Sequence, residues 1–166
     1  MKVDDVVIIQ KALHTANVRF ILVGGLAVIA HGYLRATRDA DIVIELIPDN
    51  ILRAFKALHS IDYHPTVPVT AEAFADPAQR KHWRETKHMV VLQFWSDAHP
   101  ETKLDLFLEH PFNFTKEWDQ ARIDTIYPDA PPLRIASIPT LIAMKRSAGR
   151  LRDLDDIQHL EMLSDE

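Results

Sequence analysis

The chain has 166 residues, of which 47% are hydrophobic and 26% are charged, the balance of an ordinary globular domain built on one core. It contains no cysteine, which excludes disulfides, thiolate zinc sites and thiol nucleophiles. The formal net charge of −5 argues against nucleic-acid binding by bulk charge, although a local basic face stays compatible with it. No apolar run is long enough to span a membrane, and two acids stand near the N-terminus where a secretory signal carries bases. We therefore expect a cytoplasmic protein without a membrane partner.

The first half of the chain alternates helix and strand. Apolar residues at helical spacing predict a helix over 4–17, and the β-branched and aromatic run 18–23 predicts a buried strand that ends at a Gly-Gly pair. The almost wholly apolar stretch 26–31 is typical of a short buried helix. Residues 38–46 alternate strictly between an acidic and an apolar face, which indicates a strand covered on one side.

The second half continues this mixture. Pro48 and Asp49 open a predicted helix that runs to about His59. The proline-containing and then basic stretch 60–87 is less regular and predicts a mobile excursion or a short helix. Extended segments follow, at 88–96, at 103–109 and as two pieces within 122–137. Their spacing is too irregular for a doubly wound parallel sheet, so we predict an α+β fold with a mixed β-sheet flanked by helices.

The last part of the chain is predicted to be helical. A helix begins after Ile138, and its apolar stripe drifts between Gly149 and Asp153, which predicts a break there with Asp153 capping a final short helix. We therefore divide the chain into a core, 1–137, and a C-terminal helical segment, 138–166, that packs on the core and completes the site.

Three acids on alternating strands form the most informative constellation. Asp39 and Asp41 lie two residues apart on one strand and so share a face, with Asp105 on the corresponding face of a second strand. If the two strands are neighbours, three carboxylates converge, and their repulsion calls for a divalent cation such as Mg²⁺ or Mn²⁺. Each acid taken alone is better explained as a solvent-facing strand residue.

Two further features favour phosphate binding. Gly24 and Gly25 join a strand to a helix and form a candidate phosphate cradle, although such a pair is also common as a tight turn. The C-terminal helix carries a basic face that includes Lys145 and Arg150, which either holds phosphates or is solvated and paired with nearby acids. Arg38, just before the paired acids, is open to both interpretations.

The order of these motifs resembles that of a known superfamily. The Gly-Gly pair at 24–25, DAD at 39–41, KLD at 103–105 and IPTLIAMKRSAGRLRDLDDI at 138–157 resemble the nucleotidyltransferase superfamily with the DNA polymerase beta-type fold. More narrowly, they look like the abortive-infection (AbiEii-like) nucleotidyltransferase toxins. The resemblance extends from the first helix to Ile157.

The resemblance implies a role for each matching residue. Gly24 and Gly25 would hold the triphosphate of an NTP, with Arg38, Lys145 and Arg150 as further nucleotide-binding residues. The metal ligands and catalytic acids would be Asp39, Asp41 and Asp105. The catalytic set would be completed by Lys145 and Asp153.

The implied reaction is the transfer of an NMP from an NTP to an acceptor hydroxyl. The acceptor is either RNA, as for a toxin-like enzyme with a partner antitoxin, or a small hydroxylated molecule, as for antibiotic nucleotidyltransferases. A third possibility is an inactive nucleotide-binding or antitoxin-like module. We also expect the basic residues Arg80, Lys81 and Arg84 to contact the acceptor.

Overall fold

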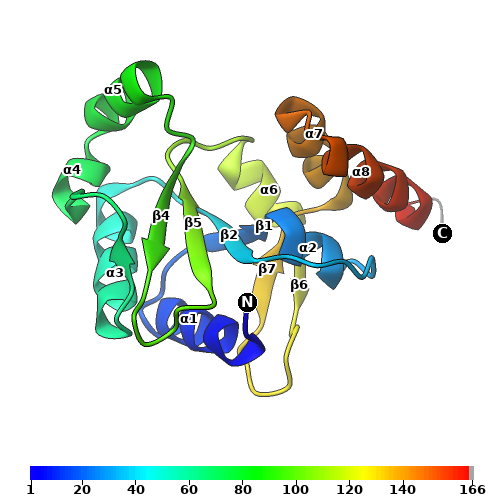
Figure 1. Ribbon diagram of the computed structural model, residues 1–166, viewed down its shortest axis with the longest axis horizontal. Coiled ribbons are helices and arrows are strands. Elements are labelled where there is room, and N and C mark those ends of the chain that lie inside the picture. The colour runs from blue at the N-terminus through cyan, green and yellow to red at the C-terminus, as the bar shows by residue number, and fades with distance from the viewer. Residues whose placement is uncertain (165–166) are drawn as a thin grey trace.

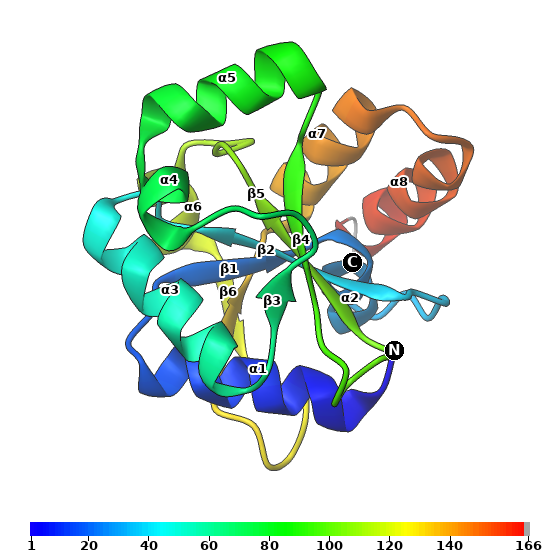
Figure 2. The ribbon, with the colours of Figure 1, turned by 60° about the vertical axis from the view of Figure 1, so that its left-hand side comes forward.

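The computed structural model describes residues 1–164 (Figures 1 and 2). Within them the helices are α1 (Val3–Thr15), α2 (Gly24–Ala30), α3 (Pro48–Ser60), α4 (Ala71–Ala75), α5 (Pro77–Lys87), α6 (Phe114–Gln120), α7 (Ile138–Ala148) and α8 (Leu151–Ser164). The strands are β1 (Phe20–Val23), β2 (Asp39–Ile44), β3 (His64–Pro65), β4 (Val91–Trp95), β5 (Lys103–Phe107), β6 (Arg122–Asp124) and β7 (Leu133–Ile135). None of these helices is long and apolar enough to cross a membrane.

The strands form one mixed sheet, which confirms the predicted α+β class. In the described residues its order is β3-β4-β5-β2-β1-β7-β6. The pairs β2–β5 and β1–β7 are parallel, and the other neighbours are antiparallel. The central strand β2 thus lies between β1, which precedes it in the chain, and β5, which follows about 60 residues later.

While β1 is buried throughout its length, much of the core lies on one face of the sheet at β2, β4 and β5. Every second residue of these strands is buried, and the ring of Phe94 on β4 packs edge-on against Phe55 of α3, with 5.2 Å between centroids. In both views α3 and α4 lie on one side of the molecule and α2, α7 and α8 on the other (Figures 1 and 2). The opposite face of β4 and β5 is only partly covered, and this face carries the polar residues.

The segment 60–87 is more ordered than its irregular pattern predicts. It contains the short edge strand β3 and the helices α4 and α5. Thr70 caps α4 by accepting a hydrogen bond from the backbone N–H of Ala73, and Asp76 caps α5 by accepting one from Ala78. Pro77 occupies the first turn of α5, a position where proline is favoured. The caps are therefore the local signals that define these helices.

The end of the chain departs from the prediction in one respect. The first C-terminal helix begins at Ile138, as expected, and stops at Gly149, whose φ of 64° is the left-handed conformation that commonly ends helices. The final helix, α8, is not short, since it has 14 residues and begins at Leu151. Asp153 does stabilise its start, because its carboxylate accepts a hydrogen bond from the backbone N–H of Arg150 at 3.0 Å. Residues 165 and 166 of the predicted segment 138–166 lie outside the described part.

Candidate active site

The backbone register brings the three acids together. β2 and β5 are parallel neighbours in which Asp41 stands opposite Asp105, and Asp39 stands opposite Lys103. Since residues two apart on a strand share a face, Asp39, Asp41 and Asp105 all project from the same side of the sheet. The sequence predicted on which face of its strand each acid lies. The pairing of β2 with β5 places those faces on the same side of one sheet.

The proximity of these acids changes their titration. Burial, together with the negative charges of Asp105 and Asp39, raises the pKa of Asp41 from 3.8 to about 7. Burial also raises the pKa of Asp105, partly opposed by a hydrogen bond from the Gln93 amide to Oδ1 at 3.0 Å. The site thus holds more negative charge than its surroundings neutralise.

Gly24 is required by the close approach of Asp41. An added Cβ at Gly24 would lie 2.1 Å from Oδ2 of Asp41, and the φ of 66° disfavours any other residue there. At Gly25 an added Cβ would lie 2.5 Å from a guanidinium nitrogen of Arg35 and 2.6 Å from the hydroxyl of Thr37. Both glycines therefore make room for side chains of the site.

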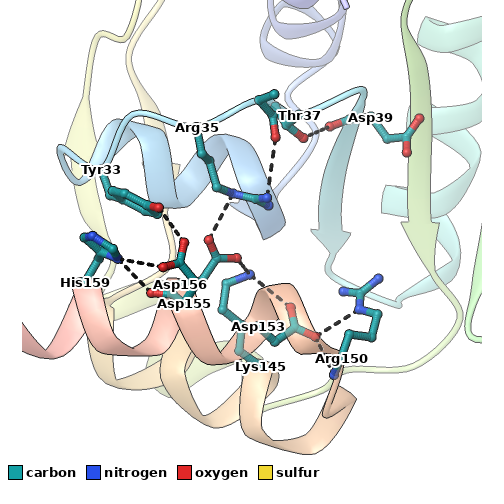
Figure 3. A network of polar contacts seen from close by, with 11 residues as sticks. Tyr33, Arg35, Thr37, Asp39, Lys145, Arg150, Asp153, Asp155, Asp156 and His159 are labelled. Carbon is teal, nitrogen blue, oxygen red and sulfur yellow. Dashed lines mark hydrogen bonds and ion pairs between the residues drawn. The ribbon is translucent and has the colours of Figure 1, made fainter.

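Lys145 lies at the centre of a buried ion cluster on α7 and α8. Its ammonium is 2.5 Å from Oδ2 of Asp156 and 3.5 Å from Oδ1 of Asp153. All three side chains are at most 7% exposed. The second oxygen of Asp153 accepts a hydrogen bond from Nε of Arg150 at 2.9 Å. The two carboxylates thereby hold the ammonium at a fixed position between the helices (Figure 3).

The loop between α2 and β2 is tied to the same cluster. Arg35 reaches Oδ1 of Asp156 with Nε at 3.1 Å, and the hydroxyl of Tyr33 donates to Asp155 at 2.5 Å. The ring of Tyr33 also stacks on His159, with centroids 3.7 Å apart (Figure 3). The loop that leads into the acidic strand is thus fastened to α8.

The two predicted nucleotide-binding arginines lie in different environments. Arg150 is 60% exposed, and its positive charge and that of Lys145 act on Asp41, lowering the pKa that burial and the other acids raise. Arg38 is exposed between Thr37 and Asp39 and forms no hydrogen bond or ion pair within residues 1–164. The structure therefore brings Lys145, Arg150 and Asp153 together beside Asp41 and leaves Arg38 at the edge.

The structure corrects the expectation for one basic residue of α5. Arg80 is buried at 7% exposure, and its guanidinium donates to the carbonyl of Phe74 and lies over the ring of that residue. It therefore holds α4 against α5 and is not available to an acceptor. Lys81 and Arg84 are on the surface, where they pair with Glu85 and Glu109.

Sequence reasoning missed Gln93, which contacts Asp105 directly. Gln93 lies within the predicted strand 88–96, but the residue pattern of that strand does not show which strand it pairs with. The pairing of Gln93 with Asp105 across β4 and β5 supplies that information.

The acids fit a hard divalent cation by their chemistry. Carboxylate oxygens are the ligands that Mg²⁺ prefers, and the raised pKa of Asp41 marks a site in which a positive charge would be stabilising. Within the described residues, no three His, Asp or Glu side chains form a preassembled ligand set. The backbone therefore brings the three acids near one another, and a cation bound here would draw their carboxylates into one ligand set.

Comparisons with known proteins bear on the fold. No protein-family model matches the sequence, and neither does any curated protein. The crystal structure of an antigenic nucleotidyltransferase-like protein from Paracoccidioides brasiliensis aligns with a TM-score of 0.52, covering 94% of this chain and 73% of that chain at 16% identity. At this identity the similarity concerns the fold alone, and the chain has a nucleotidyltransferase-like fold.

Proposed function

We propose that the protein is a metal-dependent nucleotidyltransferase that moves an NMP from an NTP to an acceptor hydroxyl. The observation that carries this proposal is the set of three carboxylates on one face of β2 and β5, with the pKa of Asp41 raised to about 7. Carboxylates this close repel one another and destabilise the native structure unless a bound cation neutralises their charge. The nucleotidyltransferase-like fold supports the same class of reaction.

In this proposal Asp39, Asp41 and Asp105 hold Mg²⁺ or Mn²⁺. The bound cation would neutralise the charge that develops on the transferring phosphoryl group. The acceptor oxygen attacks the α-phosphorus, the bond from that phosphorus to the bridging oxygen breaks, and pyrophosphate leaves with the electron pair. Asp105 accepts the proton of the acceptor hydroxyl, and Gln93, whose amide donates to Oδ1 of Asp105, fixes the orientation of its carboxylate.

The cations beside the acids would bind the triphosphate. Arg150 and Arg38 have exposed guanidinium groups that a phosphate can reach, and the backbone at Gly24 and Gly25 lies next to Asp41. Lys145 is buried between Asp153 and Asp156, so its part in phosphate binding is to supply a fixed positive charge near Asp41. Asp153 acts by holding Lys145 and Arg150.

We favour RNA over a small molecule as the acceptor. Small-molecule sites are usually concave pockets. The acids instead lie on a partly exposed sheet face, which suits a polymer. By the resemblance to abortive-infection enzymes, this activity would make the protein a toxin restrained by an antitoxin.

The transfer reaction itself tests the proposal. The purified protein is incubated with each α-³²P-labelled NTP, Mg²⁺ and total bacterial RNA, beside a D39N/D41N double variant. We expect label in RNA with the wild type and at least a 100-fold loss in the double variant, because it removes two metal ligands. The matched control is Asp119→Asn, an exposed acid on α6 that should leave the rate unchanged.

Two outcomes would contradict the proposal. One is transfer that the double variant retains, because the three acids would then not carry the reaction. The other is the absence of any label transfer to RNA or to a panel of small hydroxylated compounds, which would favour an inactive nucleotide-binding module.

A further inference from the structure

The partly covered face of the sheet carries an ordered set of side chains beside the acids. Gln93 on β4 stands opposite Asp105 on β5, which in turn stands opposite Asp41 on β2. The paired residues of β4 and β5 end at Phe94 and Leu104, and continuing that register by one residue places Trp95 beside Lys103, which stands opposite Asp39. Two parallel rows therefore cross the face, each ending at an acid of the candidate site.

The side chain of Trp95 is partly exposed on this face. It is 40% exposed, whereas its strand neighbour Phe94, which points to the other face, is 1% exposed. Lys103 is also exposed, and Leu104 beside it is fully buried. The alternation shows that Trp95 and Lys103 contribute little to the core. Their side chains are open to a ligand.

The spacing places this pair within reach of the proposed reaction. Adjacent strands lie about 4.8 Å apart, so the backbone of Trp95 is one strand from Lys103 and roughly 10 Å from Asp39. An indole offers a flat apolar surface to a base, and an ammonium offers a positive charge to a phosphate. From Trp95 toward the acids, the surface therefore offers a place for a base, then one for a phosphate, and then the acids for the reacting hydroxyl.

We propose that Trp95 and Lys103 form the acceptor-binding surface and that the acceptor is the end of a single-stranded RNA. A base stacks on the indole of Trp95, the adjoining phosphate pairs with Lys103, and the terminal hydroxyl lies at Asp39, Asp41 and Asp105. This inference rests on the proposed nucleotidyl transfer to RNA and adds to it the residues that bind the acceptor and the single-stranded form in which they bind it. The exposed position of Trp95 at the end of β4 fits a flexible strand.

Fluorescence anisotropy of a fluorescein-labelled, eight-nucleotide single-stranded RNA tests the stacking contact. The full-length protein is titrated in Mg²⁺ without NTP. We expect Trp95→Ala to weaken binding by about tenfold, since stacking of one base on an aromatic side chain is worth roughly 1–3 kcal/mol. Trp95→Phe keeps an aromatic face and should stay within about threefold of the wild type. Because the side chain is exposed, circular dichroism of both variants should match the wild type.

The salt dependence of the same titration tests the phosphate contact. Removing one phosphate contact to a single strand lowers the slope of log K against log salt by about 0.7. We expect this change for Lys103→Ala. The control is Lys56→Ala, an exposed lysine of α3, which should leave the slope unaltered.

Calorimetric binding of Mg²⁺ with a non-hydrolysable NTP separates this inference from the proposed function. We expect the NTP affinity of Trp95→Ala to equal that of the wild type. The acceptor surface would be overturned if Trp95→Ala bound RNA as tightly as the wild type, or if the wild type bound no RNA. If the protein still bound NTP in that case, the proposed function would stand. RNA binding that depends on Trp95 in a protein that binds no NTP would instead contradict the proposed function.

Discussion

At the scale of single residues, Asp41 dominates the electrostatics of the site. Its carboxylate is buried against Gly24 and lies beside two other acids. A rise of its pKa from 3.8 to about 7 corresponds to roughly 4 kcal/mol of native-state destabilisation once the carboxylate is fully ionised. The fold thus tolerates a costly charge at the position where a cation would be useful.

This cost predicts a pH-dependent effect of Asp41→Asn. Between pH 4 and 7 the native protein keeps a proton that the unfolded chain releases, so stability contributed by Asp41 falls as the pH rises and is fully lost above pH 7. At about 2–4 °C per kcal/mol, the variant should therefore melt roughly 8–16 °C higher than the wild type at pH 8. At pH 4 the two proteins should melt at nearly the same temperature.

Thermal denaturation of both proteins without Mg²⁺ at the two pH values checks this prediction. The variant Asp119→Asn, an exposed acid of α6, controls for the loss of one surface charge. A difference in melting temperature that is the same at pH 4 and pH 8 would show that Asp41 does not titrate near neutrality.

At the scale of secondary-structure elements, the loop before β2 and the helix α8 act as one unit. Arg35 pairs with the buried Asp156, which also binds Lys145, and Tyr33 stacks on His159. Only a few side chains therefore connect α8 to the strand that carries Asp39 and Asp41. Breaking them should loosen α8 more than the sheet.

We predict that Arg35→Ala increases amide hydrogen exchange in α8 by about tenfold or more. The substitution removes one of two cations from a carboxylate that is 1% exposed, and an unsatisfied buried group costs about 1–3 kcal/mol. Hydrogen exchange followed by mass spectrometry measures the effect for each peptide. The neighbouring Arg38→Ala should leave α8 protected, because Arg38 is exposed. Equal protection of α8 in Arg35→Ala and the wild type would contradict this account.

The elements that the sequence predicts correctly are those with a local signal. Strict alternation identified the strand around Asp41, and Gly149 marked the end of a helix. The helix α6 was missed because it has seven residues, and its signal is one capping residue, Asn113, which accepts a hydrogen bond from the backbone of Lys116. Short helices depend on such caps and on packing, which a periodicity analysis does not detect.

The candidate site was predictable in its residue types but not in its contacts. Alternation placed Asp39, Asp41 and Asp105 on polar faces, whereas the pairing of β2 with β5 is non-local and leaves no mark in either strand. Likewise, the spacing of the basic residues gave no sign that Lys145 is buried between two aspartates, because that depends on the packing of α7 against α8.

At the scale of the whole molecule, the charge distribution reconciles an acidic chain with an anionic substrate. The net charge is −5, but Arg150, Lys145 and Lys103 all act on the electrostatics of the candidate acids. The candidate site is therefore a local arrangement of cations around acids, placed where the α7–α8 helices meet the sheet. The remaining negative charge does not bear on binding at this site.

The most direct test of the central claim is a calorimetric titration at pH 7.0 with Mg²⁺ and a non-hydrolysable NTP, repeated in two buffers that differ in ionisation enthalpy. Because the pKa of Asp41 is about 7, about half of the protein carries a proton there, which a bound cation displaces. We predict saturable binding with release of about half a proton, and no such release in Asp41→Asn. Binding without proton release, with an affinity unchanged in the D39N/D41N variant, would show that the three acids are not the nucleotide and metal site.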